Sequence, residues 1–276
     1  MYSNTGNRQM SAFDQLMAAV RGSDGLYTAN VDESWLQGRT AFGGLSSALI
    51  AQAMRSEIEP ARRLRSLAVS FVGPAPAGNH QVALRHLRDG GSVTHIQGEL
   101  RCEGEVATAI NATYGKDRQS AVVVEGPAMP TSIPAPQDCM LLPFIDGLTP
   151  AFTQHFDMAL ASGHLPLSGG DSADFSLWLR FRDTTALTES ALIALADAPP
   201  MPGLNMIKPP GVGSSLSWYL EFPNAVSAGD TADNWWFMDY RSQAGSNGYF
   251  CNYATIWSPS GVPIMFSRQV ATVFEK

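Results

Sequence analysis

Residues 43–54, GGLSSALIAQAM, form a stretch that is apolar on almost every side when it is drawn as a helix. A helix of this kind has to be buried. Its three or so turns are too short to cross a bilayer, which needs about 20 residues. We therefore predict a core helix here.

A second copy of this helix occurs later in the chain. Residues 191–197, ALIALAD, repeat residues 48–54, ALIAQAM, with Asp197 in place of Met54. Pro199 and Pro200 follow, and the residue before a proline is pushed out of the α region, so the helix is predicted to end near Ala198. Asp197 is then expected in the last turn.

A carboxylate in this position breaks the pattern of its own helix. The negative end of the helix dipole disfavours it by about 0.3–1 kcal/mol, and burial beside apolar neighbours adds to the cost. A broken rule of this kind often marks a functional site. The alternative is that Asp197 turns outward and caps the proline-rich loop.

The composition is that of a globular protein with a large core. The chain has 276 residues, 45% of them hydrophobic, and a formal net charge of −7, which argues against a nucleic-acid binder. Cys102, Cys139 and Cys251 are too few and too widely spaced for a disulfide framework or a thiolate metal site. Residues 1–8 lack the apolar core of a signal peptide and no 18 apolar residues run together, so we expect a cytoplasmic protein that does not enter a membrane.

The strand patterns repeat around the two helices. A first helix is predicted at 11–20. Alternation and turn residues predict strands at 25–31, 67–72, 81–87, 92–100 and 106–114 in the first half, and at 174–182, 215–222, 235–240, 249–257 and 264–274 in the second. Residues 215–222 align with residues 66–71 of the first half. Five prolines between 127 and 143 indicate a linker. We predict a first unit at 1–120, a linker at 121–145 and a second unit at 146–276. Together they form an α+β fold whose continuous antiparallel sheet wraps around two helices.

With its halves set out in this way, the sequence resembles the TesB-like (thioesterase II) family of double-hotdog acyl-CoA thioesterases. In the first half the resemblance lies in residues 38–44 (GRTAFGG), 71–74 (FVGP) and 87–93 (LRDGGSV). In the second half, the family holds a water with an aspartate on the second helix, a hydroxyl residue on the following strand and a glutamine on the last strand. Asp197, Ser215 and Gln269 match these positions, although the better-known members carry threonine where this chain has Ser215, whose χ1 is less restricted.

The resemblance implies hydrolysis of acyl-CoA to free acid and CoA. Asp197 is then the general base, and a raised pKa suits that role near neutral pH, while Ser215 and Gln269 orient the water. Taken singly, the serine and the glutamine resemble surface residues. Strict strand alternation places Ser215 on one face with Ser217, Tyr219 and Glu221, and the sequence does not decide which face meets the helix.

The start of the first helix is a candidate substrate-binding element, formed by Phe42, Gly43 and Gly44. The glycine amides at this electropositive end could hold the thioester oxygen, or the glycines could serve only close packing. Arg62, Arg63 and Arg65 could meet a CoA phosphate, or lie in a solvated loop.

Two other functions remain open. The first is a hydratase or dehydratase of the same fold. A sequence that resembles that class would have a catalytic histidine soon after an aspartate, and no such pair lies near Asp197. A non-catalytic acyl-CoA-binding protein would keep the pocket without turnover. A G-x-S-x-G motif is absent, so a serine-hydrolase mechanism has no support. We expect no cofactor, no metal and no nucleic-acid partner, and we expect a homo-oligomer.

Overall fold

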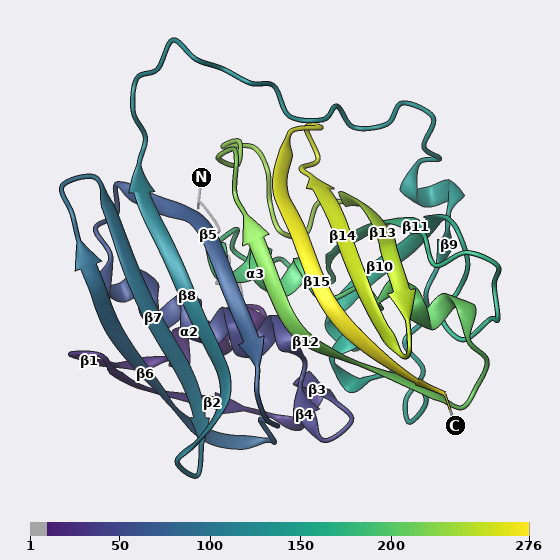
Figure 1. The fold of residues 1–276 in the computed structure, drawn as a ribbon, viewed down its shortest axis with the longest axis horizontal. Helices are drawn as coiled ribbons and strands as arrows, with labels where there is room; N and C mark the ends of the chain where they lie inside the picture. The colour runs from purple at the N-terminus through teal and green to yellow at the C-terminus, as the bar shows by residue number, and fades with distance from the viewer. Residues whose placement is uncertain (1–9, 276) are drawn as a thin grey trace, which may run out of the picture.

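The computed structural model describes residues 10–275, so the N-terminal segment examined for a signal peptide lies outside it. In this part of the chain thirteen strands form one antiparallel sheet in the order β1-β2-β6-β7-β8-β5-β12-β15-β14-β13-β11-β10-β9. The sheet curves around helices α2 and α3 (Figure 1). The predicted α+β architecture, a continuous sheet around two helices, is confirmed.

The strands of each half stay together in the sheet. The first half contributes β1 (Arg21–Ser23), β2 (Leu26–Val31), β5 (Arg62–Phe71), β6 (Gly78–Asp89), β7 (Val93–Cys102) and β8 (Glu105–Lys116), and its β3 (Leu36–Gln37) and β4 (Thr40–Ala41) pair separately. The second half contributes β9 (Met140–Leu141), β10 (Phe156–Ser162), β11 (Phe175–Phe181), β12 (Gly211–Glu221), β13 (Trp236–Ser246), β14 (Tyr249–Trp257) and β15 (Pro263–Glu275).

Three α-helices and four 3-10 turns lie between residues 10 and 275. They are α1 (Ala12–Ala19), α2 (Gly43–Glu57) and α3 (Glu189–Ala196), with 3-10 turns η1 (Glu33–Trp35), η2 (Pro136–Asp138), η3 (Ala151–His155) and η4 (Pro202–Met206). No helix between residues 10 and 275 is long and apolar enough to cross a bilayer.

The two halves join where β5 pairs with β12, with Leu67 opposite Leu220 and Ser70 opposite Ser217. Each of these strands carries one irregularity against its other neighbour, between Leu64 and Ser66 in β5 and between Ser215 and Ser217 in β12. A β-bulge adds one unpaired residue and reverses the alternation beyond it. Matching the two bulges aligns Ser215 with Leu64, so the predicted alignment of Ser215 with Ser66 was wrong.

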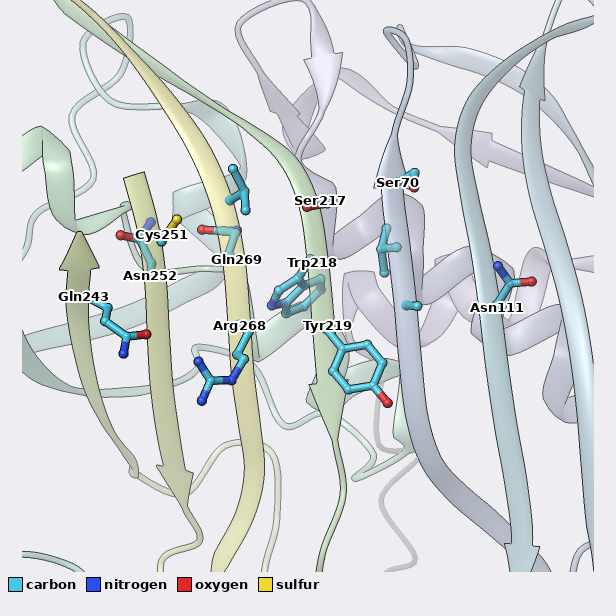
Figure 2. A pocket seen from close by; sticks show the side chains of 13 residues that line it. Ser70, Asn111, Ser217, Trp218, Tyr219, Gln243, Cys251, Asn252, Arg268 and Gln269 are labelled. Atoms are coloured by element: carbon cyan, nitrogen blue, oxygen red, sulfur yellow. The ribbon is translucent and has the colours of Figure 1, made fainter. Parts of the chain in front are cut away.

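The outer face of the central strands is polar. Figure 2 shows Ser70, Ser217, Tyr219 and Arg268 on neighbouring strands of this face, over a hollow of about 430 Å³. Ser217, Tyr219 and Arg268 are exposed. Because the sheet separates this hollow from the helices, the buried chemistry has to be sought on the inner face.

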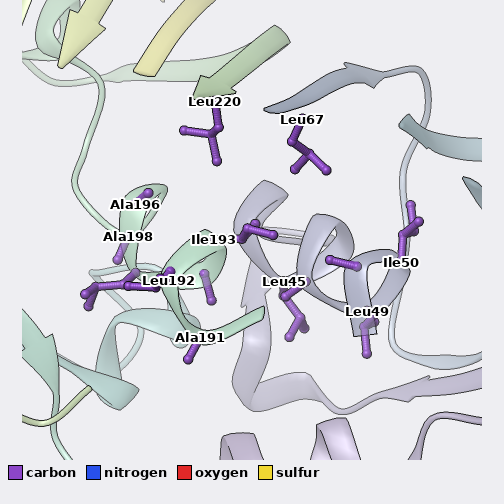
Figure 3. Packing of buried hydrophobic residues seen from close by; sticks show 14 of the residues in the cluster. Leu45, Leu49, Ile50, Leu67, Ala191, Leu192, Ile193, Ala196, Ala198 and Leu220 are labelled. Atoms are coloured by element: carbon purple, nitrogen blue, oxygen red, sulfur yellow. The ribbon is translucent and has the colours of Figure 1, made fainter. Parts of the chain in front are cut away.

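The inner face is filled by the two central helices. α2 and α3 lie side by side beneath Leu67 and Leu220, and the side chains between them include Leu45 and Ile193 (Figure 3). All four of these side chains are fully buried, and each contributes about 1.5–3 kcal/mol relative to an exposed position. The core helix predicted at 43–54 is confirmed, and it continues for one further turn to Glu57.

The connection between the halves arches away from the end of β8 and then runs along the second unit (Figure 1). Residues 117–135 contain no helix or strand. The Pro127 carbonyl accepts a hydrogen bond from Trp257 Nε1 at 2.9 Å, and the Pro134 carbonyl accepts one from Trp178 Nε1 at 2.8 Å. β9 falls within the range predicted as linker and pairs with β10. The boundaries proposed for the three segments stay a prediction.

Candidate active site

Asp197 is the C-cap of α3, at the place that the two following prolines predict. Its side chain reaches across to the start of α2, where the Gly44 N–H donates a hydrogen bond to Oδ2 at 2.6 Å. It does not turn outward to cap the proline-rich loop. The carboxylate therefore lies between the negative end of its own helix and the positive end of the other, and the second interaction offsets the first.

The glycines at the start of α2 allow this approach. A Cβ on Gly43 would lie 2.7 Å from the Phe71 ring and 2.9 Å from Asp197 Oδ2. A Cβ on Gly44 would lie 2.9 Å from Asp197 Cβ and 3.1 Å from the Ala194 carbonyl oxygen. Both positions exclude any larger residue, which supports the close-packing alternative, and the Gly44 amide is committed to Asp197.

Phe42 is the third residue predicted to bind substrate, and its side chain is almost fully buried. Its ring stacks on Phe152 at a centroid distance of 4.3 Å and lies parallel to Trp35 at 6.2 Å. These contacts fix the backbone that leads into α2. The structure therefore gives Phe42 a packing role, and contact with a substrate stays a proposal.

The bulge in β12 decides which way Ser215 points. Trp218 and Leu220 are buried toward the helices, whereas Leu216, Ser217 and Tyr219 are exposed. Since the extra residue reverses the alternation, Ser215 lies on the inner face with Trp218. The prediction that Ser215 shares a face with Ser217 and Tyr219 was wrong, and the bulge is the reason.

Gln269 on β15 connects the other two predicted residues. Its Nε2 donates to Asp197 Oδ1 at 3.2 Å and to Ser215 Oγ at 2.9 Å. Gln269 is buried. The three residues predicted from the second half thus form one hydrogen-bonded group, although they are up to 72 positions apart in the sequence.

Tyr240 on β13 is a fourth member of this group and was not predicted from the sequence. Its hydroxyl donates to Gln269 Oε1 at 2.5 Å, in a buried position. This bond occupies the amide oxygen and leaves both amide hydrogens of Gln269 for Asp197 and Ser215. Strand alternation indicates only that Tyr240 points inward. Its partner Gln269 lies two strands away in the sheet, so the hydrogen bond between them could not be predicted from local sequence.

The electrostatics of this group favour a base that works near neutral pH. Desolvation raises the pKa of Asp197 to about 7, while the hydrogen bonds from Gly44 and Gln269 limit the rise. Burial, together with the charge of Asp197, also raises the pKa of Tyr240 above its ordinary value, so its hydroxyl stays protonated and donates.

The corresponding place in the first half is apolar. Met54 replaces Asp197, Leu64 lies at the position of Ser215 when the bulges are matched, and the same register places Ala112 where Gln269 stands. All three are buried. None of them can take a proton, so the duplicated fold carries one polar site rather than two.

Replacing Met54 with leucine is therefore expected to leave turnover within about twofold of the parent, because a swap of similar volume in a core usually costs less than about 1.5 kcal/mol. Steady-state kinetics with one acyl-CoA checks this result. A large loss of activity in a protein that remains folded would show that the first half contributes to the chemistry.

The arginine cluster considered for CoA phosphate binding lies on β5 rather than in a loop. Arg62 donates to Thr94 and the Gly90 carbonyl, while Arg63 and Arg65 both reach Asp117. The guanidinium groups are thus used within the protein. Among residues 10–275, no three His, Cys, Asp or Glu side chains gather as metal ligands would.

Family models match both halves of the chain. The model of the acyl-CoA thioesterase N-terminal domain matches residues 31–115, and that of the acyl-CoA thioesterase C-terminal domain matches residues 136–273. The comparison with curated proteins gave no match.

Solved structures share the fold at low sequence identity. A hot dog fold protein of unknown function from Alicyclobacillus acidocaldarius has a TM-score of 0.85 at 22% identity, covering 97% of this chain and 100% of its own. A putative thioesterase II from Thermobifida fusca has a TM-score of 0.80 at 18% identity, with 96% and 98% covered. An acyl-CoA thioesterase II from Mycobacterium marinum has a TM-score of 0.74 at 18% identity, with 95% and 98% covered. Because both family models match in order over most of its length, the chain belongs to the acyl-CoA thioesterase family and is a TesB-like double hotdog.

Proposed function

We propose that the protein hydrolyses acyl-CoA to a free acid and CoA, with Asp197 as the general base. The observation that supports this most strongly is the carboxylate itself. It is desolvated where the two helix ends meet, its pKa is raised to about 7, and Gly44 and Gln269 hold it in place. A base with a pKa near the working pH combines a large deprotonated fraction with enough basicity to take a proton from water.

The proposed reaction has two steps. Asp197 takes one proton from a water whose oxygen forms a bond to the thioester carbon, and the carbonyl becomes a tetrahedral oxyanion. The oxyanion then collapses, the carbon–sulfur bond breaks, and the proton on Asp197 passes to the departing CoA sulfur. Asp197 is thereby returned to its ionised form, and no further reactant is required.

The direction of the hydrogen bonds assigns a role to Ser215. Gln269 donates to Ser215 Oγ, so the serine hydrogen is free to point toward the water or the developing oxyanion. The second donor we propose is the amide of Gly43, which opens α2 and has no acceptor among residues 10–275. The start of a helix is electropositive and suits an oxyanion. Gly44 and Phe42 would shape this end of the substrate site.

Ser215→Ala and Gln269→Ala are each expected to lower kcat with little change in KM, because both residues act on the water rather than on the bound substrate. The double variant is expected to lose less than the sum of the two free-energy losses, since Gln269 holds Ser215 and the two act as a unit. A double-mutant cycle on kcat measures this coupling. Strict additivity would mean that the two residues act independently.

The proposed function is tested by measuring free thiol released from a panel of acyl-CoA thioesters of different chain length. Steady thiol release with formation of the free acid supports the proposal. Tight binding without thiol release would indicate an acyl-CoA-binding protein. Addition or loss of water with the thioester intact would indicate a hydratase or dehydratase of the same fold. A cytoplasmic location and a homo-oligomeric state stay predictions.

A further inference from the structure

A row of polar side chains crosses the inner face of the second half. It consists of Ser215 on β12, Gln269 on β15, Asn252 on β14 and Ser242 on β13, which we call the polar row. Asn252 is directly opposite Gln269 on one side and Ser242 on the other. Residues that pair in this way in an antiparallel sheet project to the same face, so Ser242, Asn252 and Gln269 all point inward, and the bulge in β12 places Ser215 on that face as well.

The polar row separates two apolar clusters. On one side lies the main core, which includes Trp218, Tyr240 and Ala254. On the other side is a small cluster beneath η4, formed by Met201, Ile207, Ala271 and Val273, with Leu167, Leu204 and Phe250 packed against it. Ser242, Asn252 and Gln269 thus lie at one level of three neighbouring strands, and Ser215, which pairs with Ala271, lies next to Gln269 on the side of the small cluster.

Asn252 is the unexplained member of the row. It is only 3% exposed, and neither its Nδ2 nor its Oδ1 has a hydrogen-bond partner among residues 10–275. Leaving a buried polar group unpaired costs about 1–3 kcal/mol. The sheet would be more stable with an apolar residue here, unless a ligand supplies the missing donor and acceptor.

Two further polar atoms of this region are also unpaired in the described chain, Ser242 Oγ and Asn205 Oδ1. Both residues are anchored to the same short segment, because the Ser242 N–H donates to Asp174 Oδ1 at 2.9 Å and Asn205 Nδ2 donates to the Ala173 carbonyl at 3.1 Å. The unpaired atoms therefore lie in a region fixed by hydrogen bonds. Its polar atoms have defined positions.

We propose that Asn252, with Ser242, binds a hydroxyl or carbonyl group carried by the acyl chain of the substrate. The Cβ atoms of directly opposed residues lie about 4.5–5.5 Å apart. Asn252 is therefore a few carbon–carbon bonds from the group formed by Asp197, Ser215 and Gln269. This inference rests on the proposed thioesterase function and assigns its substrate class.

The enclosure of Asn252 favours the acyl chain over the CoA arm. The CoA arm has to lead to a charged nucleotide in solvent, whereas Asn252 is buried and the small apolar cluster lies beyond it. An acyl chain can end in such a place, with its polar substituent at the polar row and its remaining carbons against Phe250 and Met201.

The test compares kcat/KM for hexanoyl-CoA, 3-hydroxyhexanoyl-CoA and 5-hydroxyhexanoyl-CoA. The parent protein is expected to prefer one hydroxylated substrate over hexanoyl-CoA by about 10-fold, the size of one hydrogen bond to a group that is otherwise unpaired. Asn252→Leu is expected to abolish this preference while hexanoyl-CoA turnover stays within about threefold. It should fold, because it removes an unpaired buried amide. Asn111→Leu, on the exposed outer face of β8, is the matched control and should keep the preference.

Ser242→Ala removes one hydroxyl and is the second variant, expected to reduce the preference by about threefold. A parent protein that does not distinguish the three substrates would overturn the proposal. So would an Asn252→Leu variant that loses activity on all three equally, since Asn252 would then act only through ordered water or Gln269. If no substrate releases thiol, the thioesterase function fails. Calorimetric binding of the same three thioesters then decides the subsite separately, and equal affinities would overturn it.

Discussion

Asp197→Asn is expected to lower acyl-CoA turnover by roughly 10²–10⁴-fold in a protein that remains folded. Asparagine preserves the shape of the side chain and can still accept one of the two hydrogen bonds from Gly44 and Gln269, but it cannot take a proton from water. Thiol release under saturating substrate measures the effect, and circular dichroism confirms the fold.

The Met54→Leu variant is the matched control for this experiment, because Met54 occupies the same position in the other helix. If Asp197→Asn keeps the parent's activity, Asp197 is no more than a helix cap, and the main support for an enzyme is lost. If the Asp197→Asn variant unfolds, the carboxylate is structural, and the result supports the alternative of a non-catalytic acyl-CoA-binding protein.

The same substitution is expected to increase the free energy of unfolding, and the increase is expected to grow with pH. The pKa of Asp197 is about 7 in the folded protein against an ordinary value of 3.8, so the folded state holds the proton more tightly. The carboxylate therefore lowers stability progressively as the pH rises from about 4 to 7, by up to roughly 4 kcal/mol above pH 7. Asparagine does not titrate, so this loss is removed.

Urea unfolding of both proteins at pH 4 and at pH 8 measures this difference. The two proteins should have similar stability at pH 4, and the variant should be the more stable at pH 8. If the difference in stability between the variant and the parent is the same at pH 4 and at pH 8, Asp197 is not desolvated in solution.

Much of the fold follows from local sequence signals. The apolar stretches at 43–54 and 191–196 can only be buried, and the prolines after Asp197 end α3 where the structure ends it. The strand at 249–257 was predicted with its observed bounds, because turn residues flank it on both sides. β9 and β10 were missed, since their short sequences carry no clear alternation.

The site was only partly predictable. Asp197 could be identified because it breaks the pattern of a duplicated helix, while Ser215 and Gln269 needed the family resemblance. The inward direction of Ser215 depends on a bulge, and a bulge depends on pairing with a distant strand. The Tyr240 bond to Gln269 and the Gly44 bond to Asp197 are likewise long-range contacts that no local pattern encodes.

The pH dependence of kcat/KM for acyl-CoA hydrolysis tests most directly that the desolvated carboxylate of Asp197 is the base. We expect kcat/KM to rise about tenfold per pH unit at acid pH, to bend near pH 7 and to level off above it, because only the ionised form accepts a proton. The residual activity of Asp197→Asn should lack this bend. A parent profile that is flat from pH 5 to 9, or a bend near pH 7 that persists in the asparagine variant, would contradict the assignment of Asp197.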